Sequence, residues 1–118
     1  MEIVYMNKDL DGYAVYDHTR GESKSLKDID NGALFVPEEI VCYTDTNSKG
    51  EEKTICSVIT DQGTHVTTDS PYFREELLHI ASLAEQGLID SKYTVRVVKQ
   101  VSKGGRTFTT CTLVRPEK

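Results

Sequence analysis

The last quarter of the chain is rich in basic side chains, whereas the rest is acidic. The 118 residues include 14 basic and 19 acidic ones, and residues 91–118 hold 7 of the basic residues but, of the acidic ones, only Glu117. Residues 1–90 therefore carry a net charge of −11, and residues 91–118 one of +6. This asymmetry favours a basic patch that contacts the phosphates of a polyanion. The alternative is that exposed edge strands carry lysine and arginine as protection against aggregation. The basic side chains are Lys92, Arg96, Lys99, Lys103, Arg106, Arg115 and Lys118.

Aromatic side chains are the second group suited to binding, because bases stack on flat rings at about 1–3 kcal/mol per base. The chain has six tyrosines and three phenylalanines but no tryptophan. We expect Tyr43, near the end of a predicted strand, to stack on a base, with Tyr93 and Phe108 as further candidates. The alternative for Tyr43 is a packed side chain with its hydroxyl at the surface. The expected phosphate contacts are Arg96, Lys99, Lys103 and Arg106.

Residues suited to catalysis or metal binding form no local pattern. None of the three histidines has aspartate, glutamate or cysteine at a metal-ligand spacing. Glu75, Glu76 and His79 approach such a spacing on a helix, but an acidic first helical turn explains the two glutamates better. No phosphate-binding loop and no Gly-x-Ser-x-Gly motif is present. We therefore expect no enzyme activity, no cofactor and no metal, with a Cys–His pair formed only in space as the open alternative.

The three cysteines, Cys42, Cys56 and Cys111, are widely spaced and include no Cys-x-x-Cys pair. A zinc ribbon and a thioredoxin-like redox pair are therefore excluded. Each cysteine lies in a strand-like run, where a free thiol behaves as a small hydrophobic side chain. We expect all three to be structural thiols in a reducing cytosol.

The elements that position these residues are mostly strands. Short runs of β-branched and aromatic residues alternate with turn residues such as glycine, asparagine and aspartate. Residues 3–17 are expected to form a hairpin, and Asp61-Gln62-Gly63 predicts a three-residue hairpin loop. The predicted strands in residues 1–70 are Ile3–Met6, Tyr13–Tyr16, Ala33–Val36, Ile40–Thr44, Thr54–Thr60 and His65–Thr67.

One segment has the periodicity of a helix. Ser70 as N-cap and Pro71 as first helical residue predict a helix over residues 71–86, with Gly87 as its C-cap. Apolar residues follow at steps of three or four, and such a stripe packs into a core. The stripe consists of Phe73, Leu77, Ile80, Ala81, Ala84 and Leu88.

The basic C-terminal segment predicts a hairpin of two strands, Tyr93–Val101 and Arg106–Val114. A two-residue Gly104-Gly105 loop fits a primed turn. That register pairs Val101 with Phe108 and leaves a basic, hydroxyl-rich strip on the other face. A sharp bend of the strands would break this alternation and expose Phe108. The predicted apolar face consists of Tyr93, Val95, Val97, Val101, Phe108 and Val114.

Length and composition indicate one globular domain over residues 1–118. Hydrophobic residues make up 37% and charged residues 28% of the chain. No apolar run approaches the roughly 20 residues of a membrane span, and the first residues lack the pattern of a secretory signal. We expect a cytoplasmic protein with no membrane partner. The predicted fold is mainly β with one α-helix, as a small OB-like barrel or a strongly curled antiparallel sheet.

The order of these segments resembles the single-stranded-DNA-binding proteins of small tailed phages that replicate DNA by protein priming. The resemblance covers most of residues 9–114, whereas the three cysteines and the terminal tail depart from it. The segments that carry it are Asp9–Gly12, Ser25–Ile29, Ile40–Tyr43, Glu51–Thr54, Asp61–Gly63, Tyr93–Val98, Ser102–Gly104 and Phe108.

This resemblance implies an OB-related fold and sequence-tolerant coating of exposed DNA strands during phage replication, without catalysis. The implied partner is single-stranded DNA, with replication proteins as further partners, in the cytoplasm of the host cell. The match carries a DNA-contacting role to Tyr43 and to the region of Lys99 and Lys103.

A different class of function fits the acidic part of the chain. Small acidic β proteins of mobile elements are often protein-binding modules, including inhibitors of host defence systems. The net charge of −11 over residues 1–90 would then dock on a basic host protein or imitate nucleic acid. Binding would depend on glutamates rather than on the basic side chains, namely Glu38, Glu39, Glu51 and Glu52.

Overall fold

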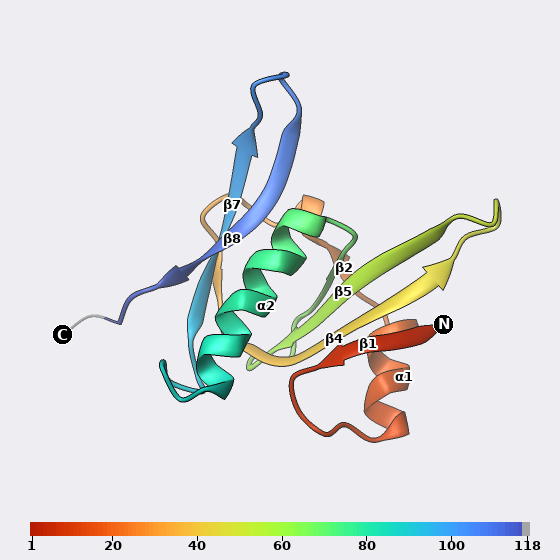
Figure 1. The fold of residues 1–118 in the computed structure, drawn as a ribbon, viewed down its shortest axis with the longest axis horizontal. Coiled ribbons are helices and arrows are strands. Elements are labelled where there is room, and N and C mark those ends of the chain that lie inside the picture. The colour runs from red at the N-terminus through yellow and green to blue at the C-terminus, as the bar shows by residue number, and fades with distance from the viewer. Residues whose placement is uncertain (117–118) are drawn as a thin grey trace.

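Helix α2 packs between two sheets in the computed structural model, which describes residues 1–116 (Figure 1). The five-stranded sheet has the order β1-β4-β5-β6-β2, and only its β2–β6 pair is parallel. The three-stranded sheet has the antiparallel order β3-β7-β8. The strands of the first sheet are β1 (Glu2–Met6), β2 (Lys24–Ser25), β4 (Pro37–Thr46), β5 (Glu52–Thr60) and β6 (His65–Thr68). Those of the second are β3 (Leu34–Phe35), β7 (Thr94–Val101) and β8 (Thr107–Val114).

The prediction of a mainly β fold with a curled antiparallel sheet is confirmed. The chain crosses from the second sheet to the first at Val36, between β3 and β4. Within residues 1–116 no ladder joins the two sheets, so the OB-like barrel does not close. The loop Asp61-Gln62-Gly63 between β5 and β6 also agrees with prediction, with Gly63 at φ +81° and its N–H on the carbonyl of Thr60.

Helix α2 (Pro71–Glu85) agrees closely with the helix expected over residues 71–86. The Ser70 side chain accepts a hydrogen bond from the Phe73 N–H, as an N-cap does. Gly87 ends the helix at φ +74°, where a side chain would be strained, and Leu88 N–H reaches back to the Leu83 carbonyl.

The core lies where α2 meets the two sheets. The buried side chains of α2 pack on apolar side chains from both sheets, because each element buries one face against the others. The three cysteines are free thiols and all are buried. The core residues from α2 are Phe73, Leu77, Ile80 and Ala81, those from the first sheet include Ile40, Cys42, Cys56 and Val58, and those from the second are Val95, Val97 and Cys111.

The strand predicted at Tyr13–Tyr16 is wrong, and so is the hairpin over residues 3–17. Residues Gly12–Arg20 form helix α1, so the fold has a helix more than expected. The Asp11 side chain accepts a hydrogen bond from the Ala14 N–H, which makes Asp11 an N-cap rather than a turn residue. Only His18 of this helix is buried, so the apolar stripe that would have signalled a helix is absent.

The C-terminal hairpin forms, but its predicted register is wrong by one residue. Val101 pairs with Thr107, and Phe108 pairs with Gln100. The loop is Lys103-Gly104-Gly105, closed by a hydrogen bond from Ser102 N–H to the Arg106 carbonyl, with Gly105 at φ +80°. This is a three-residue loop rather than a two-residue primed turn.

The shift moves side chains of β8 to the opposite face of the sheet. Cys111, expected on the polar face, pairs with Val97 and is buried. Phe108, expected on the apolar face, lies on the other pleat and is half-buried. Val101 is exposed rather than part of the core, because it lies where the hairpin extends away from the body.

No helix within residues 1–116 has both the length and the apolar character needed to cross a membrane. Glu117 and Lys118, which contribute to the charge of the C-terminal segment, lie outside the described residues.

Candidate nucleic-acid interface

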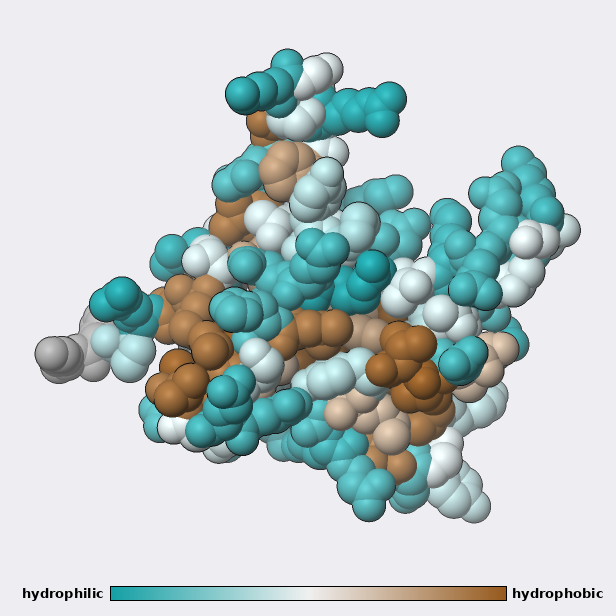
Figure 2. All heavy atoms as spheres, viewed as in Figure 1, coloured by the Kyte–Doolittle hydropathy of each residue, from teal (hydrophilic) through white to brown (hydrophobic). Residues whose placement is uncertain are grey.

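The hairpin of β7 and β8, called here the basic hairpin, extends away from the rest of the molecule (Figure 1). Lys103 and Arg106 flank its end, and both are exposed. Figure 2 shows hydrophilic residues at the ends of both projecting hairpins, the other being that of β4 and β5. Exposed basic side chains of this kind are suited to contact phosphates, which carry the charge but not the sequence of a strand.

A groove of about 400 Å³ lies at the base of the basic hairpin, beside the N-terminus of α2. We call it the hairpin groove. Lys99 and Phe108, two residues predicted to bind nucleic acid, both line it. It is also lined by Tyr72 of α2 and by Lys27 of the short 3-10 helix η1 (Leu26–Asp28). The fold thus brings together residues 27, 72, 99 and 108, which are far apart in sequence.

Two aromatic rings lie against each other at this groove. The ring centroids of Tyr72 and Phe108 are 4.7 Å apart and the planes are tilted by 43°. Two hydrogen bonds hold this part of α2 on β8: Thr110 Oγ1 donates to the Tyr72 carbonyl at 3.3 Å, and Ser70 Oγ donates to the Thr109 carbonyl at 2.8 Å. Because Tyr72 is 56% exposed, a further flat ring can pack on the pair.

Lysine side chains supply positive charge to the groove. Lys99 Nζ donates to the Lys27 carbonyl at 3.0 Å, which holds the two lysines close together. The one carboxylate that lines the groove, Asp69, has Lys53 Nζ at 3.4 Å from its Oδ2. The acidic first turn expected for this helix is absent, because Glu75 and Glu76 follow the first turn of α2, so the N-terminus of α2 adds the positive end of a helix dipole.

Arg96 is exposed but does not belong to this groove. It pairs with Leu34 of β3 and with Thr112 of β8, in the middle of the three-stranded sheet. Its side chain lies on the pleat opposite to buried Val95 and Val97. Of the four predicted phosphate contacts, Lys99, Lys103 and Arg106 thus follow the hairpin, and Arg96 lies apart on its outer face.

The two tyrosines expected to stack on bases are buried. Tyr43 is 5% exposed within β4, between β1 and β5, and burial, with Asp45 nearby, raises the pKa of its hydroxyl. Tyr93 is also buried and belongs to the core cluster. Neither ring is exposed enough in this structure for a base to stack on it. Tyr43 is therefore packed in the sheet, which was the alternative to a stacking role.

Tyr72 is the groove residue that the sequence analysis missed. Its only signal is its place in the helix, because it lies next to Phe73 but off the apolar stripe. An aromatic side chain that a helix does not bury is available for binding. Phe108 was predicted as a candidate for stacking, although with a different register of the hairpin.

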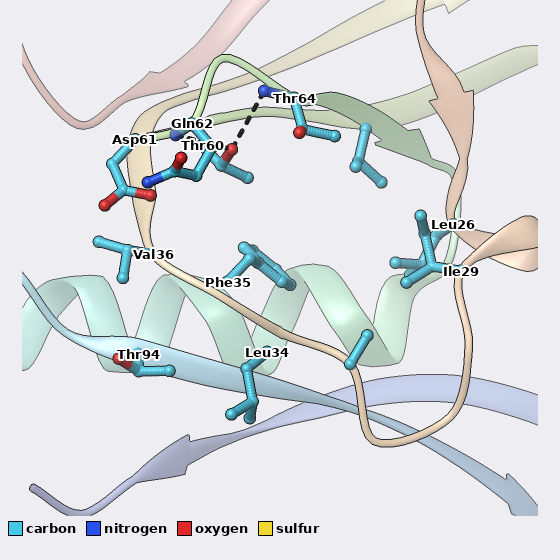
Figure 3. Close-up of a pocket in the computed structure, with 12 residues that line it drawn as sticks. Leu26, Ile29, Leu34, Phe35, Val36, Thr60, Asp61, Gln62, Thr64 and Thr94 are labelled. Carbon is cyan, nitrogen blue, oxygen red and sulfur yellow. Dashed lines mark hydrogen bonds between the residues drawn. The ribbon is translucent and has the colours of Figure 1, made fainter.

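A second hollow, of about 390 Å³, lies between η1, β3 and the β5–β6 loop (Figure 3). Its wall is mostly apolar, with Leu26, Ile29 and Phe35 directed into it. Thr64 N–H donates to Thr60 Oγ1 at 3.1 Å and shapes the loop at its rim. Among the described residues that line this hollow none is basic, so it lacks the positive charge that the hairpin groove has.

The four glutamates of the protein-binding alternative do not form one patch. Glu38 forms an ion pair with Lys8 at 3.3 Å, and Glu39 contacts His18. Glu52 pairs with Thr46, seven residues along β4 from Glu39, so the two pairs of glutamates lie about 23 Å apart. Within residues 1–116, no three His, Cys, Asp or Glu side chains are grouped so as to hold a metal ion.

The chain matches no protein-family model, no curated protein and no solved structure. The resemblance to the phage proteins therefore rests on the ordered segments of the sequence alone.

Proposed function

We propose that the protein binds single-stranded nucleic acid without reading its sequence and without catalysing a reaction. The observation that carries this proposal is the contact of the exposed Tyr72 ring with the half-buried Phe108 ring, beside Lys99 in the hairpin groove. Proteins of this class combine a positively charged path for the backbone with aromatic rings for the bases. Both parts are present here at one site.

In this proposal a base packs against Tyr72 and Phe108, and its phosphate lies near Lys99 and Lys27. The strand then follows the basic hairpin toward Lys103 and Arg106. Arg96, on the outer face, would contact phosphate only if the strand wraps around the sheet. Lysine and arginine suit this role because each neutralises one phosphate irrespective of the base.

The resemblance to phage proteins favours DNA as the natural ligand and replication as its setting. The net charge of −11 over residues 1–90 supports this arrangement, since acidic side chains repel the phosphates of a strand and favour its approach to the basic hairpin. Replication proteins would be further partners.

The test is fluorescence anisotropy of a labelled oligo-dT titrated with the protein at low and moderate salt. We expect saturable binding that weakens steeply as salt rises, because counterions are released from each neutralised phosphate. A labelled oligo-U and a duplex of the same length distinguish DNA from RNA and single from double strands. Absence of binding at tens of micromolar protein and low salt would reject the proposal.

A further inference from the structure

We propose that Glu39, His18, Ser57 and His65 form a proton-binding site that fastens helix α1 to the five-stranded sheet. Each side chain comes from a different element: Glu39 from β4, His18 from α1, Ser57 from β5 and His65 from β6. None of these residues belongs to the hairpin groove.

The four side chains form one continuous chain of hydrogen bonds. His18 Nε2 lies 2.9 Å from Glu39 Oε1, and His18 Nδ1 lies 2.8 Å from Ser57 Oγ. Ser57 Oγ lies 2.7 Å from His65 Nε2, and His65 Nδ1 lies 3.0 Å from the Glu22 carbonyl oxygen. The two imidazole rings are 5.6 Å apart and nearly perpendicular. Ser57 and His18 are almost completely buried, so water cannot replace these partners.

This series of hydrogen bonds needs one proton more than the neutral side chains supply. A carbonyl and a carboxylate only accept hydrogen bonds, so His65 Nδ1 and His18 Nε2 must both carry a proton. If both rings are neutral, His18 Nδ1 and His65 Nε2 both need the single proton of the Ser57 hydroxyl, for which the His18 carbonyl oxygen at 3.3 Å also competes. One nitrogen would then face an oxygen lone pair at less than 3 Å with no proton between them. One added proton completes all four contacts.

One added proton fits either direction of this series of hydrogen bonds, and we assign the direction in which His65 holds it. His65, with both nitrogens protonated, donates to Ser57, Ser57 donates to His18 Nδ1, and His18 donates to Glu39. The proton belongs on His65 rather than on His18, because burial lowers the pKa of His18, partly offset by Glu39 and Asp17. His65 is only half-buried, and the negative charge of Glu39 balances its positive charge along the chain.

This site determines how firmly α1 is held. His18 is the one buried side chain of α1 within the described residues, and His65 binds the backbone just after the helix at Glu22. Loss of the proton as the pH rises leaves one mispaired contact at Ser57, between the two histidines that attach this part of the chain. We therefore expect α1 to open locally more often at high pH than at low pH, while α2 remains closed.

The first test is the 15N spectrum of the histidine rings between about pH 5 and pH 8. We expect His65 to gain its second proton while His18 stays neutral with the proton on Nε2. His79, exposed on α2 and outside the network, is the reference in the same spectrum. A spectrum in which His18 carries its proton on Nδ1, or becomes charged before His65, would overturn the proposal.

The second test is the amide-exchange protection of α1, relative to that of α2, over the same pH range. We expect the opening equilibrium of α1 to rise about tenfold from the acidic to the alkaline end, since a charged hydrogen bond is lost. His65→Gln supplies an N–H that does not titrate, so this variant should lose the pH dependence, whereas the control His79→Gln should keep it. A pH dependence that persists in His65→Gln would contradict the proposal. If that variant does not fold, the ring spectrum of the parent protein decides.

Discussion

At the hairpin groove, the exposed ring of Tyr72 is the surface on which a base would stack. We predict that Tyr72→Ala raises the dissociation constant for oligo-dT about 5- to 150-fold, because stacking on one ring contributes about 1–3 kcal/mol. Anisotropy titrations measure this effect. The matched control is Tyr13→Ala, since Tyr13 is 86% exposed on α1 and lies outside the groove. Equal losses in the two variants would mean that the groove is not the stacking site.

Tyr43 and Tyr72 show how far the exposure of a single tyrosine can be predicted from the sequence. Tyr43 was expected to be accessible because it lies near the end of a predicted strand. Helix α1 covers its side of the sheet instead: His18 contacts Ser57, which lies on the same face as Tyr43. Residue type and spacing therefore identified Lys99 and Phe108, which the fold brings to one groove, but not which tyrosine is exposed.

At the scale of elements, the basic hairpin can be compared with the β4–β5 hairpin of the same molecule, because each has an exposed lysine in its loop. Lys103 lies in the loop of the basic hairpin, and Lys49 lies in the loop of the β4–β5 hairpin, both exposed. We predict that Lys103→Ala weakens binding to all single-stranded sequences alike. It should also reduce the slope of log K against log salt by about one.

Lys49→Ala is the control for the hairpin, because it removes the same charge from a loop outside the proposed path. Its salt slope should equal that of the parent protein. If Lys103→Ala and Lys49→Ala change the slope equally, the effect reflects net charge alone and not contact along the basic hairpin.

Most elements were predictable because their signals are local. Ser70, Pro71 and Gly87 specify both ends of α2 without reference to the rest of the fold. Two predictions were wrong, the strand at Tyr13–Tyr16 and the register of the C-terminal hairpin. In both cases the local sequence is compatible with two structures. Asp11 can serve as a turn residue or as an N-cap, and a Gly-Gly pair fits a two-residue or a three-residue loop.

At the scale of the whole molecule, the arrangement of the two sheets could not be predicted from the sequence. The hydrophobic runs predicted that strands pack around one helix, and this is what the core contains. They did not predict that the strands on the two sides of Val36 belong to different sheets, because pairing partners far apart in sequence decide that. The hairpin groove exists only through this long-range arrangement, so its composition was not predictable as a set.

The core that joins the two sheets also makes the stability of the whole molecule sensitive to alkaline pH. Burial, with Cys111 and Glu85 nearby, raises the pKa of Tyr93 to about 12. The pKa of tyrosine in an unfolded chain is about 10. The folded state therefore holds this proton more tightly, and its contribution to stability is complete below about pH 10 and decreases as the pH rises toward about 12. We predict that the free energy of unfolding of the parent protein falls across this window. Tyr93→Phe keeps the buried ring but has no hydroxyl to ionise, so its loss should be smaller by on the order of 2 kcal/mol. Urea unfolding at several pH values measures both curves, and parallel curves would show that Tyr93 does not couple ionisation to folding.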